Sequence, residues 1–158
     1  ILEFVITYSL GIDLIENKTL GLVYNLLNFL FLPIILIVIA LNNFKKNVNN
    51  GFMSFAQGLK AGVTVTVIAG LIYAIFNIIF NLIFPEFAIE VMSKTKQVMI
   101  EANPNLTQEQ LDMSIAMAEK FSSPFITAPV TVAMYAFIGL IYSLIISAIL
   151  KNDQPQGY

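Results

Sequence analysis

The chain has 158 residues, of which 58% are hydrophobic and 11% are charged, against about 25% charged residues in soluble domains. A soluble domain of this length could not cover that much apolar surface, whereas lipid solvates it, so we expect an integral protein of a lipid bilayer. The net charge of −2 excludes the basic field that nucleic acid requires. Without cysteine or histidine, the chain has no disulfide, thiolate or imidazole chemistry, and we expect no catalytic residue, cofactor or metal site.

The first segment, at about 1–12, predicts the end of an apolar helix. Its run ILEFVITYSLG is too short to cross a bilayer alone. Either residues upstream of Ile1 complete the helix, which we favour, or the segment only dips into the bilayer. In the first case Glu3 is a candidate intramembrane acid, which would need a partner or a proton.

Three longer apolar runs predict complete spans, at about 20–41, 58–84 and 124–150, and their one charged residue is Lys60, near the start of the second run. The middle run has no aspartate, glutamate, lysine or arginine between Lys60 and Glu86. A helix of that length covers the roughly 30 Å hydrocarbon core of a bilayer.

Two local features modify the first of these spans. Pro33 removes one backbone hydrogen bond, so we expect a kink near Phe29. The polar run NNFKKNVNNG, from Asn42, predicts a loop after the span.

Residues 85–123 predict an extramembrane antiparallel helical hairpin. Pro85 suits the first turn of a helix, and apolar residues follow it at helical spacing. The turn Asn103-Pro104-Asn105 ends this helix, and Thr107 with Gln110 forms a capping box that opens the next. The hairpin is either an ordinary solvated element or a docking arm for a partner.

The predicted fold is therefore an all-α membrane protein with four transmembrane helices, the first incomplete in this chain, in a single membrane domain over 1–158. Lys45, Lys46 and Lys60 surround the loop between helices two and three without any acid, which places that loop in the cytoplasm. The hairpin is richer in acids and lies outside. Abundant Ile, Asn and Lys without Arg indicate a bacterium, so the expected location is the inner membrane.

Small residues recur every four positions on two of the spans. This spacing lets helix backbones approach closely where lipid provides no hydrophobic drive, so we interpret the residues as packing seams, with a conduction path as the alternative. The seam residues are Gly58, Gly62, Thr66 and Gly70 on helix three and Gly139, Ser143 and Ser147 on helix four.

A polar layer is predicted near the outer ends of helices two, three and four. Counting the helical rise from each end gives these side chains similar depths, and buried amides without partners are costly in lipid. The layer is either interhelical hydrogen bonding or a polar site open to the outer face. Its members are Asn25, Asn28, Asn77, Asn81, Thr131 and Tyr135.

From Gly51 onward the chain resembles a known family. The runs that carry the resemblance are GFMSFAQGLKAG, NLIFPEF, TQEQLDMSIAMAEKF and AILKN. They are similar to the small integral membrane proteins of Bacteroidota catalogued as domain of unknown function 4199. The resemblance implies a four-helix topology and a bacterial source, and it implies no activity and no functional residues.

Two functions follow from these features. The first is a non-enzymatic accessory or scaffolding subunit of a larger membrane complex, which docks through the hairpin or through its small-residue helix faces. The second is a small oligomeric transporter or channel with a polar site at the asparagine layer. The expected partners are the lipid bilayer and a membrane protein or further copies of the chain, and not nucleic acid.

Overall fold

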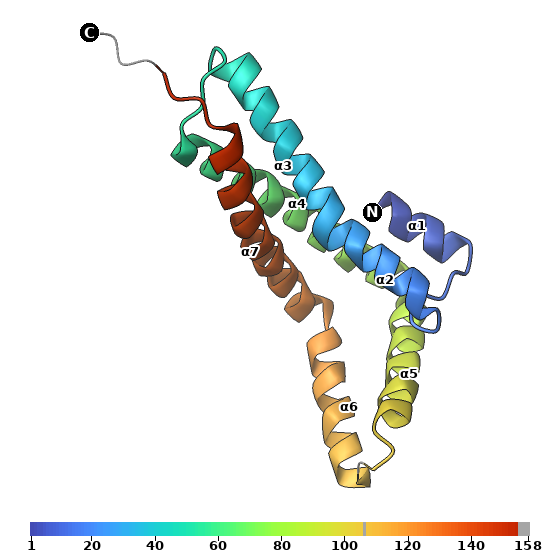
Figure 1. The fold of residues 1–158 in the computed structure, drawn as a ribbon. Coiled ribbons are helices and arrows are strands. Elements are labelled where there is room, and N and C mark those ends of the chain that lie inside the picture. The colour runs from blue at the N-terminus through green and yellow to red at the C-terminus, as the bar shows by residue number, and fades with distance from the viewer. Residues whose placement is uncertain (106, 155–158) are drawn as a thin grey trace. The chain divides into compact units, whose positions relative to one another are not determined.

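A computed structural model describes residues 1–105 and 107–154 (Figure 1). The described chain is helical, as predicted. Its elements, in chain order, are α1 (Leu2–Ser9), α2 (Lys18–Leu26), the π-helical η1 (Leu27–Phe31), α3 (Leu32–Asn43), the π-helical η2 (Phe44–Val48), α4 (Phe55–Ile83), α5 (Pro85–Ala102), α6 (Gln108–Ser122) and α7 (Pro124–Leu150).

Three helical stretches within the described residues are long and apolar enough to cross a membrane: Lys18–Val48, Phe55–Ile83 and Pro124–Leu150. They correspond to the three complete spans predicted above. The fourth predicted span corresponds to α1, which has 8 residues and is too short to cross by itself.

The second span is longer than predicted. The loop expected from Asn42 is wrong in its first half, because the helix continues as η2 to Val48. Within this extension, Lys45 Nζ donates a hydrogen bond to the carbonyl of Leu150, the last residue of α7, at 3.1 Å. A cation at a helix C-terminus satisfies a carbonyl that has no intrahelical partner.

The chain divides into two compact units. The first unit consists of Ile1–Lys18 and Tyr73–Val130, and the second of Thr19–Ile72 and the chain from Thr131 onward. The predicted single domain ends at 158, and residues 155–158 lie outside the described residues.

In the second unit, α4 and α7 meet along the predicted small residues, which we call the α4–α7 seam. A Cβ added to Gly58 would lie 2.7 Å from Ser147 Oγ, and one added to Gly70 would lie 2.8 Å from Tyr135 Cβ. Between these two pairs, a Cβ on Gly62 would overlap Ser143, and a Cβ on Gly139 would overlap Thr66. Thr66, Ser143 and Ser147 are buried. The two backbones are therefore as close as glycine allows at four successive contacts, which span just over three helical turns.

Pro33 shapes the other helix of this unit. Proline has no N–H to donate to the carbonyl of Phe29, four residues earlier. The π-helical segment η1 lies at this point, and the Tyr142 hydroxyl on α7 donates to the Phe29 carbonyl at 3.0 Å. Where a kink was expected, the helix changes to the π type, and a side chain from α7 replaces the missing donor.

The end of the second unit near η2 is closed by a short backbone pairing. Met53 and Asn152 exchange two backbone hydrogen bonds of 2.8 Å, and Asn152 Nδ2 donates to the Gly51 carbonyl. Buried Met53 packs there with Ile37, Leu41 and Ile146.

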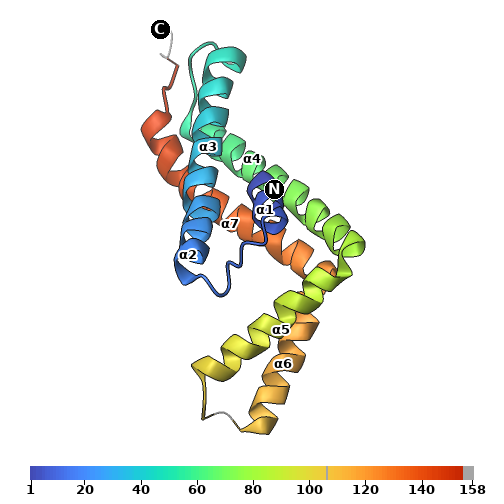
Figure 2. The ribbon, with the colours of Figure 1, turned by 90° about the vertical axis from the view of Figure 1, so that its right-hand side faces the viewer.

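In the first unit, α5 and α6 follow each other through a short turn (Figure 1, Figure 2). Pro85 lies in the first turn of α5, as predicted. The capping box of α6 is confirmed, because Thr107 Oγ1 accepts from the Gln110 N–H and Gln110 Oε1 accepts from the Thr107 N–H. None of the described side chains of α5 or α6 is buried, so the tight packing of two apolar stripes against each other stays a prediction.

Candidate functional site

An aromatic cluster in the first unit positions α1. The Phe4 ring lies edge-on to Phe80, with the centroids 4.9 Å apart, and also contacts Phe76 and Phe87. Tyr8, one turn later, lies edge-on to Phe80 at 5.0 Å. Edge-to-face contacts of this kind contribute about 0.5–1.5 kcal/mol beyond area burial. They seat α1 on the second half of α4 and the first turn of α5.

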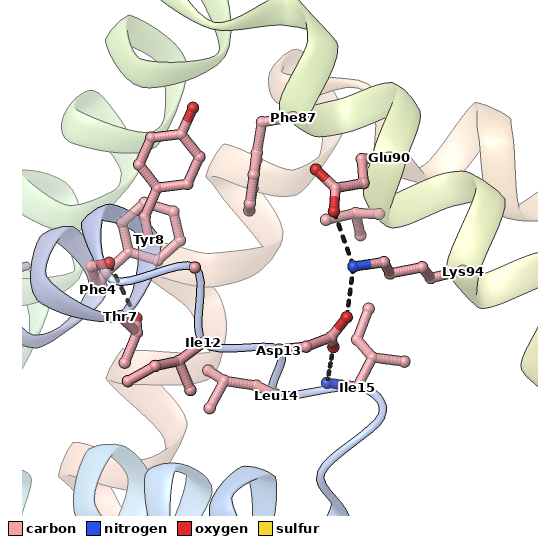
Figure 3. Close-up of a pocket in the computed structure, with 12 residues that line it drawn as sticks. Phe4, Thr7, Tyr8, Ile12, Asp13, Leu14, Ile15, Phe87, Glu90 and Lys94 are labelled. Carbon is pink, nitrogen blue, oxygen red and sulfur yellow. Dashed lines mark hydrogen bonds and ion pairs between the residues drawn. The ribbon is translucent and has the colours of Figure 1, made fainter.

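This seating creates a cavity of about 340 Å³ on the first unit (Figure 3). Its walls come from α1, from the loop that follows α1, and from α5. Most of the lining is apolar, and one edge is charged. The lining residues are Phe4, Thr7, Tyr8, Gly11, Ile12, Asp13, Leu14, Ile15, Phe87, Glu90, Val91 and Lys94.

The charged edge is a three-member network across the cavity mouth. Lys94 Nζ pairs with Asp13 Oδ2 in the loop and with Glu90 Oε1, one turn earlier on α5, at 2.7 Å. The other Asp13 oxygen accepts the backbone N–H groups of Ile15 and Glu16 at 2.8 and 3.0 Å. Asp13 therefore organises its own loop and ties that loop to α5, as Figure 3 shows.

The network is reflected in the titration of its members. The hydrogen bond from Lys94, supported by the Glu16 N–H, lowers the pKa of the Asp13 carboxyl from 3.8 to about 2. The bonds to Asp13 and then Glu90 raise the pKa of the Lys94 ammonium above its ordinary value. Asp13 and Lys94 are thus both charged at neutral pH, and the network contains two acidic residues and one lysine.

The cavity has the chemistry of a binding site for an apolar group next to a cation. Phe4, Tyr8 and Phe87 provide apolar and aromatic surface. The Glu90 side chain is 60% exposed, and one of its oxygens is bonded to Lys94, which leaves the other to accept a donor from outside. Within the described residues no group of three acidic, histidine or cysteine side chains could hold a metal ion.

The surfaces of α5 and α6 beyond the cavity are strongly amphipathic, and large apolar side chains there remain open. Met113, Met117 and Phe121 on α6 are 59%, 57% and 57% exposed, and Ile89 on α5 is 70% exposed. Contiguous exposed apolar surface next to charged residues is typical of a protein or membrane interaction site. We refer to α5 and α6 together as the arm.

The predicted polar layer is divided between the two units. In the first unit Asn81 Nδ2 donates to the Asn77 carbonyl at 2.8 Å and to Asn77 Oδ1 at 3.2 Å. In the second unit Asn28 Nδ2 donates to the carbonyl of Tyr24 on its own helix. Both amides thus find partners four residues earlier. Association of the two pairs across units stays a prediction.

The other three predicted members of the polar layer also lie in the second unit, away from the Asn77–Asn81 pair. Asn25 is exposed, whereas Thr131 and Tyr135 are half-buried. Tyr135 packs its Cβ against Gly70 at one end of the α4–α7 seam. Tyr135 thus takes part in helix packing.

The cavity and its ion network are not evident from the sequence. Asp13 and Lys94 are 81 residues apart. In the sequence, neither residue differs from the other charged residues of its polar segment. A weak signal exists: Asp13 precedes a turn, where aspartate side chains accept backbone N–H groups, and Phe4 and Tyr8 share one face of a helix.

Comparison with known proteins identifies a family. The model of a family described as "Protein of unknown function (DUF4199)" matches residues 1–152. No curated protein and no solved structure shows significant similarity to the chain.

Proposed function

We propose a function from the structure itself, because the chain belongs to the DUF4199 family, which is described as being of unknown function. In this proposal the chain is a non-enzymatic integral membrane protein that acts as an accessory subunit of a larger membrane complex. It docks onto its partner through the arm and the cavity at the base of α5. The observation that carries the proposal is the exposed apolar surface of α5 and α6, in which no described side chain is buried.

The α4–α7 seam supports the choice of the arm. Small-residue faces were one of two candidate docking surfaces. Along the seam, however, the small residues of α4 face those of α7 in the same chain, and Ser143 and Ser147 are fully buried. That face is therefore unavailable to a partner, and the arm is the remaining candidate.

The charges of the arm indicate the chemistry of the partner surface. Its acids outnumber its lysines by six to three, and like charges oppose both self-association and binding to anionic lipid head groups. A protein with lysine or arginine residues around an apolar groove matches both the acids and the exposed apolar side chains. The acids are Glu86, Glu90, Glu101, Glu109, Asp112 and Glu119, and the lysines are Lys94, Lys96 and Lys120.

The cavity adds a second point of contact in this arrangement. An apolar side chain of the partner would enter between Phe87 and the loop after α1, and a neighbouring cation would pair with Glu90. Deeply seated apolar anchors with adjacent charge pairs typically dominate binding energy at protein interfaces.

The membrane arrangement is also part of the proposal. The chain lies in the inner membrane of a bacterium, with four spans when α1 is completed upstream, and with the arm outside. Three apolar helices of sufficient length support the spans, and the lysine distribution supports the orientation.

Photo-crosslinking in native membranes tests the proposal. A photoreactive amino acid is placed at Met117 on the arm and, as a matched control, at Phe137, which is 64% exposed on the α7 span. Crosslinking to another protein is expected from position 117 and only to lipid from position 137. The adduct should weaken with added salt and in a Glu109→Gln, Asp112→Asn variant.

Two results would contradict docking by the arm. An adduct with twice the mass of the chain would show that the arm pairs with a second copy. Crosslinking of position 117 to lipid alone would show that the arm lies on the membrane surface.

A further inference from the structure

The charged residues of the second unit all lie at one end of it, where η2 and α7 end and α4 begins. The rest of the unit, over 19–44, 61–72 and 131–150, has no aspartate, glutamate, lysine or arginine. Four lysines and one aspartate give this end a net positive charge. These residues are Lys45, Lys46, Lys60, Lys151 and Asp153.

Hydrogen bonds bring three of the four lysines together. Lys45 Nζ donates to the carbonyl of Leu150 at 3.1 Å. Lys46 directly follows Lys45, and Lys151 directly follows Leu150, so two further lysines lie next to this bond. Both are exposed, and neither pairs with a carboxylate in the described part of the chain. Their charges are therefore available to an anion from outside.

A pocket of about 220 Å³ opens at the same end. The two backbone bonds between Met53 and Asn152 hold its walls together, which are the loop before α4 and the segment after α7. Gln57 Oε1 accepts from the Ser54 N–H at 2.9 Å and from Asn49 Nδ2 at 3.3 Å. Gln57 Nε2 makes no bond to the described residues and can donate to a ligand. The lining residues are Asn49, Phe52, Met53, Ser54, Gln57 and Gln154.

The position of this pocket matches the depth of lipid head groups. The ends of membrane spans lie at the head-group level of a bilayer. With the membrane placement proposed above, on which this step rests, the level is that of the cytoplasmic leaflet, where anionic phospholipids attract lysines. Val48 and Phe55, which flank the loop between η2 and α4, are 65% and 38% exposed and offer apolar surface to the acyl chains beside the pocket.

We infer that this pocket and its lysines bind the head group of an anionic phospholipid. The phosphodiester lies against Lys46 and Lys151, and the hydroxyl groups of a glycerol head group enter the pocket, where Gln57 donates to them. A phosphodiester oxygen only accepts hydrogen bonds, which ammonium and amide N–H groups donate. A zwitterionic head group also carries a cation, which the lysines repel. The site therefore favours phosphatidylglycerol over phosphatidylcholine.

Native mass spectrometry of the full-length chain tests this inference. The chain is transferred to a mild detergent that contains phosphatidylglycerol and phosphatidylcholine in equal amounts, and the retained lipids are identified by mass. We expect wild-type chain to retain phosphatidylglycerol in preference. Each basic residue near anionic lipid contributes about 1 kcal/mol, or about fivefold, so Lys46→Gln, Lys151→Gln should lower the preference by on the order of tenfold.

The matched control removes the same charge from the arm. Lys96 and Lys120 are exposed there, and Lys96→Gln, Lys120→Gln should keep the preference of the wild-type chain. An equal loss in both pairs of variants would overturn the inference, because any lysines would then serve. Equal retention of the two lipids by wild-type chain would overturn it as well.

Gln57→Glu separates the pocket from a diffuse positive field. The substitution keeps an oxygen that accepts from the Ser54 N–H and replaces the Nε2 donor with an anionic oxygen. Its control is Asn50→Asp, which adds the same charge at an exposed residue outside the pocket lining. Loss of the preference in Gln57→Glu and its retention in Asn50→Asp are expected, whereas equal effects would remove the pocket from the site.

Two further measurements identify what fails. Release of bound phosphatidylglycerol by soluble glycerol phosphate would overturn the lipid and indicate a site for soluble phosphate compounds. Carbonate extraction tests the membrane placement: a chain that stays in the membrane pellet without a lipid preference overturns the lipid site alone, and a chain released into the supernatant overturns the placement. The photo-crosslinking result from the arm does not depend on the lipid preference.

Discussion

The α4–α7 seam and the arm use helices in opposite ways. Along the seam, small side chains such as Gly62 and Ser143 let two backbones touch, and hydroxyl groups are buried. On the arm, the side chains are large and charged, and no described side chain is buried. Each helix face of the seam is therefore covered by the other helix. The arm exposes apolar and charged side chains together, as a surface that binds another protein does. Substitutions in the two regions should differ in kind: seam changes affect folding, and arm changes affect association.

The largest effect is expected from enlarging a seam glycine. In Gly139→Leu even the first added carbon would lie 2.6 Å from Thr66 Cβ, so the helices must separate. Overpacking of this kind costs typically 1–3 kcal/mol. Thermal unfolding of the purified chain measures the loss. Ala133→Leu, on an exposed position of the same helix, should leave stability unchanged, and equal loss in both would refute the seam.

A smaller loss of stability is expected when the Tyr142 hydroxyl, which replaces the N–H that Pro33 lacks, is removed. Tyr142→Phe leaves the Phe29 carbonyl without the hydroxyl that bonds it, at a cost of about 1 kcal/mol. Adding Pro33→Ala should recover part of this loss, since the backbone regains an N–H. A double-mutant cycle on unfolding measures the coupling, and strictly additive losses would show that the two sites are independent.

In the first unit, Asp13→Asn should loosen the loop after α1 without unfolding the protein. The variant loses the charge that Lys94 pairs with. Maleimide labelling of Leu14→Cys, in a chain with no other cysteine, should become faster. Unchanged labelling would mean that the ion pair does not hold the loop.

The same loop gives a pH prediction. The folded-state pKa of Asp13 is lowered to about 2, so its contribution is fully present above the ordinary value of 3.8 and is lost as pH falls toward 2. Labelling of Leu14→Cys at each pH with a dipyridyl disulfide, which reacts with thiols in acid, should stay slow relative to a free thiol down to about pH 4. Opening of the loop between pH 7 and 5 would contradict the assignment.

The smallest effect is expected at a seam serine. Ser143 Oγ is buried and accepts no hydrogen bond from the described residues, so Ser143→Ala removes a polar atom that contributes little. We expect a change within about 0.5 kcal/mol in either direction. A loss well above this value would show that the hydroxyl makes a bond that matters to folding.

The sequence was informative where a rule needs only neighbouring residues. Apolar runs located three spans, the four-residue spacing of Gly58 to Gly70 indicated the face of α4 that meets α7, and Thr107 with Gln110 identified a helix start. The resemblance to the family was confirmed as well.

The sequence did not predict contacts between residues that are far apart in the chain. Pro33 implies an open carbonyl at Phe29, but which side chain reaches it depends on the α7 register. Lys45, in the unpredicted extension to Val48, bonds a carbonyl that is more than a hundred residues away in the chain. The cavity likewise depends on the seating of α1, which aromatic contacts across elements decide.

Native gel electrophoresis of gently solubilised membranes tests the central claim, that the arm docks onto a partner. Wild-type chain should migrate in a species larger than the chain alone. Met117→Asp should release it as free chain with unchanged helicity and unfolding temperature, and Ala116→Asp, which adds the same charge at the next exposed position of α6, should stay in the larger species. A larger species that survives Met117→Asp, or wild-type chain that migrates alone, would contradict docking through the arm.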